Sequence, residues 1–511
     1  MTPLSASSET RFQRALNRVE RVGNALPHPA TLFLGLSVLV VLVSWAVNRA
    51  GIEVEHPVTG RLVVAANLLS LEGIRQIILG VLPNFIGFAP LGSVLMSVLG
   101  LSVAEHSGLL AAMVRVLVQA TPARILTWVV VFTGTMSHSA GDVGYVLLLP
   151  LSAALFHSVG RHPLTGLAAA LAGVSGGFAA NLLLSPTDVI LSGLTQESAR
   201  MIDPTYVVTP MANYFFLAAS VLLVTATGTL VTERLVEPRL GRYKGDVKPQ
   251  PVVPLTAAER RGLRWAAISL VVLAGVILAG LLPDGGVLQN PKKPGFVGSY
   301  FVEGLVFFIF LFGLIPGIAY GLGAGTIRSD SDVYKGMQKN LELMASYIVV
   351  VFFISQFVNL FGQTRLGVIL AIKGAALLGD LQLGAIPLLL GLVVLTMIVD
   401  IVFGSASAKW AILAAVFVPM FMLLGYTPEL TQVAYRVGDS ITNIMSPLSS
   451  NFPLILMFVQ RYAPKAGIGT TVALFMPYSL CNFVCWSLFL VIWLLLGWPI
   501  GPGAEIHLVG P

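Results

Sequence analysis

Four charged residues lie inside long apolar segments of this sequence: Asp188, Lys409, Arg436 and Asp439. A charge in such a segment costs roughly 2.5–3.5 kcal/mol on membrane-insertion scales, so each is a candidate for ligand or ion binding. Arg436 has the fork geometry that binds a carboxylate, and Asp188 or Asp439 is suited to exchange a proton or to help hold Na⁺. The structural alternative is a local ion pair, since Arg436 and Asp439 are three residues apart on one helical face.

Trp410, next to Lys409, is predicted either to stack on an aromatic substrate or to pack in the core. Asp142 is predicted either to cap a helix or to line the site, and Asp400 is equally open. Five polar residues at membrane depth are expected mainly to form hydrogen bonds between helices: Asn84, Asn181, Gln356, Asn359 and Asn443. Asn443 is also kept as a substrate-binding candidate, and Asn181 as a neighbour of a Na⁺ site near Asp188 and Asp439.

The composition places these residues in a membrane. The 511-residue chain is 56% hydrophobic and only 11% charged, and its mean hydropathy is +0.86. The net charge of +6 is carried by short loops beside apolar segments, so it indicates membrane topology and no nucleic-acid partner. Cys481 and Cys485, four apart in one apolar helix, are expected to be packing residues without a disulfide or metal.

Basic loops predict the topology. The N-terminal segment and the loop at 232–262 are rich in arginine and are expected to be cytoplasmic, whereas the tail after Trp498 has no Lys or Arg and should lie outside. An odd number of crossings is then needed. We expect an all-α membrane protein with about nine full spans, near residues 29–48, 79–104, 163–183, 207–231, 265–283, 299–322, 341–361, 428–447 and 470–498.

Two further apolar segments, at about 125–157 and 383–425, are interrupted midway by small polar residues. All basic loops lie on the cytoplasmic side if each segment enters the membrane and returns to the side from which it came. The first segment then enters from the cytoplasm and the second from outside. Non-helical backbone at membrane depth must be buried in protein or face a watery cavity. The sequence therefore predicts two oppositely oriented re-entrant hairpins whose tips meet near the membrane centre.

The hairpins belong to an internal repeat. The pattern Ser-x-Ser-Ala occurs at 137–140 and 405–408, an offset of 405 − 137 = 268, and in each copy a proline-initiated span with a later Ser-Pro follows. Inverted repeats with interrupted helices are typical of secondary transporters, and opposed helix ends favour an anionic substrate. The alternative is that small residues recur only because they let helices pack closely.

One alternative is a transporter of other organic anions or dicarboxylates, and two other functional classes also remain. His138, Ser139 and Asp142 are the residue types of a hydrolytic triad, although no HExxH, GxSxG or P-loop motif is present. Paired broken hairpins also line passive channels. Net flux against a gradient distinguishes a transporter from a channel.

Seven stretches resemble the aminobenzoyl-glutamate transporter (AbgT) family: NFIGFAPLG at 84–92, AEHSG at 104–108, GDVGYVLLLP at 141–150, GRHPL at 160–164, GVSGGFAANLLL at 173–184, GSASAKW at 404–410 and YRVGDSITN at 435–443. The resemblance implies nine spans and two hairpins in a bowl-shaped homodimer of the bacterial inner membrane, with a basin open to the cytoplasm. It also implies transport of p-aminobenzoyl-glutamate, or export of sulfonamides and p-aminobenzoate. The coupling ion, H⁺ or Na⁺, and the direction stay open.

By this resemblance, the family's functional positions map onto five residues here, with Ser407 beside the tryptophan: Asp188, Trp410, Pro428, Arg436 and Asp439. We accordingly expect Trp410, Arg436, Ser407, Pro428 and Asn443 to bind substrate, and Asp188 and Asp439 to couple ions. No enzymatic activity and no cofactor are expected. The expected regions are a cytoplasmic segment 1–28, scaffold helices 29–122, a first hairpin and broken helix 123–206, central helices 207–380, a second hairpin and broken helix 381–458, and a last helix and tail 459–511.

Overall fold

The computed structural model describes residues 27–55, 60–119, 121–137, 144–248, 254–381, 384–449 and 451–508. Within these ranges the chain is mostly helical, and its named strands are one short antiparallel pair, β1 (Glu53–Glu55) and β2 (Leu62–Val64). Eight of the described helices are long and apolar enough to cross a membrane. The mostly helical, multi-span class agrees with the sequence, whereas the count of nine spans and the re-entrant geometry stay predictions.

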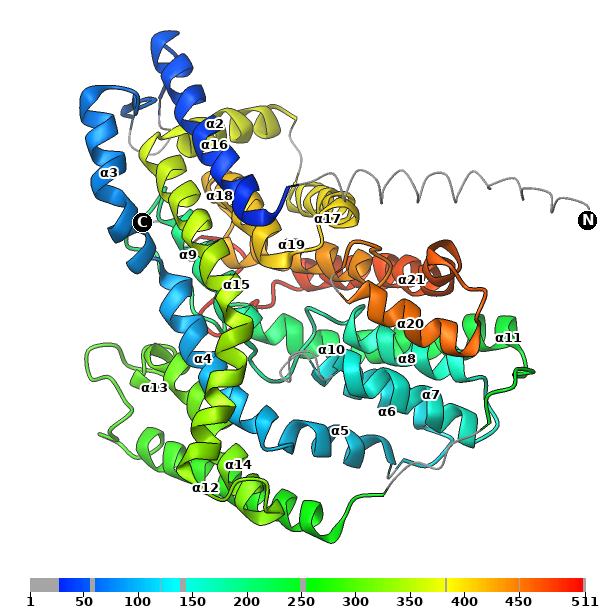
Figure 1. The fold of residues 1–511 in the computed structure, drawn as a ribbon. Helices are drawn as coiled ribbons and strands as arrows, with labels where there is room; N and C mark the ends of the chain where they lie inside the picture. Colours follow the sequence, from blue (N-terminus) through cyan, green and yellow to red (C-terminus); the bar gives the residue numbers. More distant parts are fainter. Residues whose placement is uncertain are drawn as a thin grey trace, which may run out of the picture.

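Six long helices form a scaffold along one side of the molecule (Figure 1). α14 packs along both α12 and α4, and α15 contacts α2, α3 and α4. Glycine permits the close approach of α4 and α14, since a Cβ on Gly100 would lie 2.1 Å from the Phe310 carbonyl oxygen. The scaffold helices are α2 (Pro29–Arg49), α3 (Leu71–Ile86), α4 (Ala89–His106), α12 (Ala257–Leu281), α14 (Leu305–Ala324) with the short α13 (Tyr300–Glu303) before it, and α15 (Asp330–Gln363).

The first repeat unit is a set of shorter helices packed around α8. The segments on both sides of the first predicted hairpin tip, α6 and α7, contact α8, while the part of the tip at 138–143 lies outside the described residues. The helices are α5 (Leu109–Gln119), α6 (Leu126–Met136), η2 (Gly144–Leu148) continuing into α7 (Leu149–Ser158), α8 (Pro163–Val174), α9 (Pro186–Ala199), and α10 (Tyr214–Val231) continuing through η3 (Thr232–Val236) into α11 (Glu237–Leu240).

The second unit repeats this order around α19. Both α17 and α18, which flank the second predicted tip, contact α19, and the final helix α21 packs against α10 of the first unit. Trp486 in α21 donates a hydrogen bond from Nε1 to Ser220 Oγ in α10 at 2.9 Å. The helices are α16 (Leu366–Asp380), α17 (Ala385–Val402), α18 (Ala406–Leu423), α19 (Pro428–Asn443), α20 (Phe452–Tyr462) and α21 (Ile468–Leu495).

Proline starts the central helix of each unit. Pro163 and Pro428 are the first residues of α8 and α19, a position where a missing N–H costs no helical hydrogen bond. The residues before them cap the helices: His162 accepts a hydrogen bond from the Leu164 amide, and Thr427 Oγ1 accepts one from the Leu430 amide. The prolines that marked the repeat in the sequence therefore set where both helices begin.

The structure differs from the predicted spans in several places; for example, the span predicted at 79–104 is divided between α3 and α4. α8 ends at Val174 and not near 183, because a glycine-rich stretch follows and the chain becomes helical again only at Pro186. α12 begins at Ala257, where Thr256 and Glu259 form a capping box, so its first turns carry arginines that hydropathy assigned to a loop. α15 has 34 residues, and α16 was not predicted.

The crossing of α6 and α8 depends on glycine. A Cβ on Gly173 would lie 2.2 Å from the Val131 carbonyl oxygen, which is backbone and cannot move alone. We expect Gly173→Ala to destabilise the protein by about 1–3 kcal/mol, the usual cost of overpacking. Thermal unfolding in detergent measures this. The matched control is Gly275→Ala in α12, where no atom lies within 4 Å of the new Cβ, and equal stability of the two variants would contradict the prediction.

Candidate substrate and ion site

The candidate site lies where the broken helix of the first unit meets the second unit. α9 packs against both α18 and α19, and these two helices contact each other. The five charged residues brought together there are almost fully buried, with exposed fractions of 1–3%: Asp188, Asp400, Lys409, Arg436 and Asp439. Charges at this depth are stable only when paired or hydrogen-bonded, so their partners determine what the site can do.

Arg436 pairs with Asp188 across the two units. Arg436 Nη1 lies 2.6 Å from Asp188 Oδ1, and the two side chains are 3% and 1% exposed. The other oxygen, Asp188 Oδ2, accepts hydrogen bonds from the Ser185 amide at 2.7 Å, from Ser185 Oγ at 2.8 Å and from Asn181 Nδ2 at 2.9 Å. Asp188 is therefore fixed at the start of α9 and presents one oxygen to Arg436.

The Arg436 guanidinium keeps unused hydrogen-bonding capacity. Its Nε is buried and has no hydrogen-bond partner among the described residues. The same is true of Asn181 Oδ1, on the side chain that donates to Asp188. Native proteins satisfy most buried polar atoms, so such atoms call for an explanation, and a missing ligand is one. An arginine whose ion pair uses a single nitrogen can still donate to a further carboxylate through two nitrogens.

Lys409 joins two carboxylates from different helices. Its Nζ lies 2.6 Å from Asp439 Oδ1 in α19. The same Nζ forms an ion pair with Asp400 Oδ1 in α17. Asp400 Oδ2 also accepts a hydrogen bond from Thr442 Oγ1 at 2.8 Å. The sequence left open an ion pair between Arg436 and Asp439, and the structure does not form it. Arg436 pairs with Asp188 in α9, and Asp439 pairs with Lys409 in α18.

Trp410 is part of the protein core in this conformation. Its ring stacks on Tyr435, with centroids 4.5 Å apart and planes at 26°, and its Nε1 donates to Thr195 Oγ1 at 2.9 Å. Thr195 Oγ1 in turn donates to Gln432 Oε1 at 2.6 Å. With an exposed fraction of 0%, Trp410 contacts a substrate only if the site rearranges.

The remaining predicted site residues are spread along two helices. Ser407 is half-buried in the first turn of α18, two residues from Lys409, whereas Pro428 and Asn443 are the first and last residues of α19. Asn181 contacts Asp188, and Asp439 belongs to the lysine cluster. His138, Ser139 and Asp142 lie outside the described residues.

One predicted role for polar residues is seen directly in the scaffold. Asn84 Nδ2 donates to Gln356 Oε1 at 3.1 Å, and Gln356 Nε2 donates to the Val81 carbonyl at 2.9 Å, so these amides join α3 to α15. Asn359 instead donates to Ser355 in its own helix. The hydrogen bonds between helices that were expected of Asn84 and Gln356 are confirmed.

Sequence reasoning missed a buried acid and several hydroxyl and ring partners. Glu429 is only 5% exposed, yet it drew no attention because it sits next to a helix-starting proline, where acids are common. Its position seven residues before Arg436 was the available signal, since i and i+7 share a helical face. The other residues missed are Thr195, Gln432, Tyr435 and Thr442.

Replacing Lys409 by methionine should leave two buried carboxylates without their cation. Losing one partner of a buried ion pair costs about 3–5 kcal/mol, so we expect Lys409→Met to lower the thermal unfolding temperature strongly. Adding Asp400→Asn should recover part of the loss. Lys293→Met is the control, because Lys293 pairs with Glu303 on an exposed surface where such pairs contribute little. A Lys409→Met protein as stable as this control would contradict the assigned pairing.

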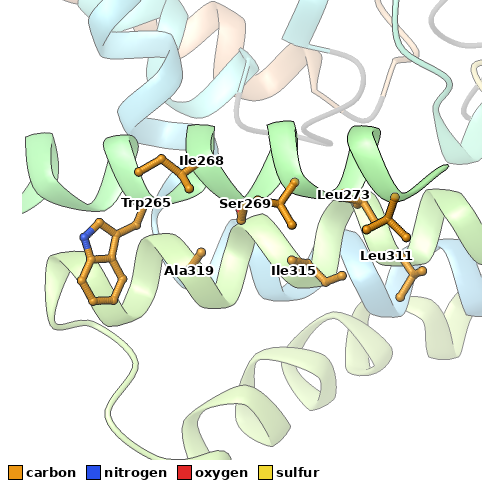
Figure 2. Close-up of a pocket in the computed structure, with 9 residues that line it drawn as sticks. Trp265, Ile268, Ser269, Leu273, Leu311, Ile315 and Ala319 are labelled. Carbon is orange, nitrogen blue, oxygen red and sulfur yellow. The ribbon is translucent and has the colours of Figure 1, made fainter. Parts of the chain in front are cut away.

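The groove between α12 and α14 has a different chemistry. It is lined by apolar side chains including Trp265, Ile268 and Leu273 of α12 and Leu311 and Ile315 of α14 (Figure 2). It contains none of the charged site residues. Such a surface suits lipid acyl chains and lacks the groups that would bind an anion.

Interrupted helices that carry buried, paired charges within a multi-span helical fold are typical of membrane transporters. The chain belongs to the AbgT putative transporter family, whose sequence model matches residues 14–508. This membership confirms the resemblance seen in the sequence.

Three relatives cover nearly the whole chain. The p-aminobenzoyl-glutamate transport protein of Escherichia coli K12 is 39% identical over 503 residues, which are 98% of this chain and 99% of that protein. The YdaH transporter structure of Alcanivorax borkumensis has a TM-score of 0.89 at 43% identity, covering 93% of this chain and 100% of its own. MtrF of Neisseria gonorrhoeae, described with a class of antimetabolite efflux pumps, has a TM-score of 0.90 at 42% identity, with coverages of 96% and 100%. The relatives are transporters and not enzymes.

Proposed function

We propose that the protein is an ion-gradient-driven secondary transporter of p-aminobenzoyl-glutamate and related aromatic carboxylates. The name of the Escherichia coli relative supports this substrate class. The description of MtrF supports export of antimetabolites, such as sulfonamides and p-aminobenzoate, as a second use of the same site. In this proposal the protein works as a homodimer in the bacterial inner membrane, with its N-terminus in the cytoplasm and its C-terminus outside.

The observation that carries the proposal is the pair between Arg436 and Asp188. Asp188 presents to Arg436 the same chemical group that a substrate carboxylate would present. The unused Arg436 Nε allows an incoming carboxylate to bind through two nitrogens, so substrate can displace Asp188. Because the partners come from different repeat units, substrate binding changes the contact between the units.

An apolar cavity beside the break in the first unit provides space for an aromatic ring. The cavity has a volume of about 360 Å³ and is bounded by Leu182, Leu183 and Leu184, which lead into the Ser185 cap of Asp188. Small-molecule sites commonly have this size. The lining is apolar apart from Tyr214, and much of it comes from α14. The ring of an aminobenzoyl group suits an apolar cavity of this size.

Ion coupling follows from the charges of the site. Three aspartates and two cations leave one negative charge in excess when all five groups are ionised. Displacing Asp188 from Arg436 would expose a second uncompensated carboxylate, and taking up H⁺ or Na⁺ removes that cost. Binding of the anion and of the coupling ion is thereby linked, with Asp188 and Asp439 as the ion-coupling residues and Trp410, Ser407, Pro428 and Asn443 shaping the substrate site.

Alternating access is assigned to the two hairpins. In this proposal α6 with α7 and α17 with α18 are re-entrant arms that enter from opposite sides, and the units exchange shapes to open the site to each side in turn. The shared packing of each pair of arms on the central helix of its own unit supports this assignment.

Uptake into proteoliposomes tests the proposal. We expect labelled p-aminobenzoyl-glutamate to accumulate above its external concentration under an imposed pH or Na⁺ gradient, and unlabelled sulfonamide to compete. Equilibration without accumulation under either gradient would indicate a channel and contradict the proposal. Absence of any uptake or competition would exclude this substrate class.

A further inference from the structure

Glu429 is a buried acid in the first turn of α19 that the substrate site does not use. Its side chain is 5% exposed, and no Lys, Arg or His nitrogen of the described residues forms an ion pair with it within 4 Å. Its partners are neutral: Tyr206 OH donates to Glu429 Oε2 at 2.9 Å, and Asn213 Nδ2 donates to the Glu429 carbonyl at 2.9 Å. A carboxylate buried without a cation is costly, and proton uptake removes that cost.

Glu429 lies on the face of α19 that leads to the charged cluster. Glu429, Gln432, Arg436 and Asp439 are spaced i, i+3, i+7 and i+10, so they form one polar stripe along the helix. At 1.5 Å per residue the stripe rises about 15 Å. Gln432, between Glu429 and Arg436, accepts the hydrogen bond of Thr195, so polar groups continue along the whole stripe.

The surroundings of Glu429 connect it to the protein surface. Tyr206 is half-buried and follows the exposed residues Pro204 and Thr205, so its hydroxyl joins the buried carboxyl to a solvent-facing segment. Asn213 is 2% exposed, and its Oδ1 has no hydrogen-bond partner among the described residues, which leaves an acceptor beside Glu429 for a water or proton donor.

Three charged side chains beside this segment, those of Glu197, Arg200 and Asp203, already have partners. Arg200 donates to the Tyr206 carbonyl and pairs with Glu197 at 3.6 Å, and Asp203 accepts hydrogen bonds from Thr205. The C-terminal segment packs here through backbone, with Thr427 Oγ1 donating to the Glu505 carbonyl. These residues hold the segment in place and leave Glu429 without a countercharge.

We propose that Glu429 is the proton-accepting residue at the mouth of the ion-coupling path, and that Tyr206 orients it. A proton from solvent protonates the Glu429 carboxylate and then passes along the polar face of α19 to the aspartates of the charged cluster. The proton is released on the other side of the membrane during the transport cycle, and no other covalent bond changes. This inference rests on the proposed ion-coupled transport and specifies H⁺ as the coupling ion.

Glu429→Gln separates this role from substrate binding. In proteoliposomes we expect Glu429→Gln to retain exchange of labelled for unlabelled substrate, which needs no net proton movement, and to lose accumulation driven by a pH gradient at least tenfold. Glu429→Asp should retain part of that accumulation. Glu303→Gln is the control, an acid already paired with Lys293 on an exposed surface, and should accumulate substrate like the wild type.

The outcomes distinguish this inference from the proposed function. Full pH-driven accumulation by Glu429→Gln would overturn the inference and leave the proposed function intact, as would wild-type accumulation driven by Na⁺ alone. Failure of the wild type under every gradient would overturn both. Should Glu429→Gln not fold, infrared difference spectra of wild type and Glu429→Asp decide: a carboxyl band that appears on acidification and shifts in Glu429→Asp supports the role, and identical spectra overturn it.

Discussion

Replacing Arg436 by alanine is expected to abolish transport of carboxylated substrates. Hydrogen bonds to charged groups are worth about 1.5–3 kcal/mol each, so losing a bidentate contact should weaken binding at least about 100-fold. Arg436→Lys keeps the charge and loses the fork geometry, so we expect an intermediate loss. Binding of p-aminobenzoyl-glutamate to purified protein, measured by titration calorimetry, provides the affinities.

A second variant controls for folding in this experiment. Arg436→Ala alone leaves Asp188 buried without its cation, which is itself destabilising. The double variant Arg436→Ala with Asp188→Asn removes both charges and should recover stability without recovering binding. Normal binding and transport by a folded Arg436→Ala protein would remove Arg436 from the site.

Replacing Asp188 or Asp439 by asparagine is expected to uncouple transport from the ion gradient. Either change removes a carboxylate that can take up H⁺ or Na⁺, while the amide keeps the size of the side chain and a hydrogen-bond acceptor. Asn at position 188 can still accept from Ser185, so the start of α9 should persist. We expect gradient-driven accumulation to fall to equilibrium, at least a tenfold loss, with substrate exchange retained.

The double variant provides the sharper comparison. Proteoliposomes carrying Asp188→Asn with Asp439→Asn should show the same substrate distribution with and without an imposed gradient. Unchanged accumulation by this double variant would show that neither aspartate couples ions. Asp330→Asn, at the exposed first residue of α15, is the control and should accumulate substrate normally.

The sequence predicted the broken helices well because their signals are local. Prolines at 163 and 428 mark the first residues of α8 and α19. The small polar residues at 404–408 mark the break before α18, which begins at Ala406. Lengths were less predictable. The stretch after Val174 remains apolar, so hydropathy extends the span, while the glycines at 176 and 177 end the helix.

The charged residues were identified from sequence, but their pairing was not. Arg436 and Asp439 are neighbours in the chain, whereas the actual partner of Arg436 lies 436 − 188 = 248 residues away in another unit. Local spacing carries no information on such a contact. Trp410 illustrates the same limit, because its stacking on Tyr435 depends on how α18 crosses α19.

Counterflow with wild type and Arg436→Ala is the most direct test that an aromatic carboxylate moves through the Arg436 site by alternating access. Proteoliposomes loaded with unlabelled p-aminobenzoyl-glutamate are diluted into labelled substrate without any ion gradient. A transient overshoot of label in wild-type vesicles, absent with Arg436→Ala, is the expected result. Wild-type uptake that rises to equilibrium without overshoot, or an equal overshoot in the variant, would contradict it.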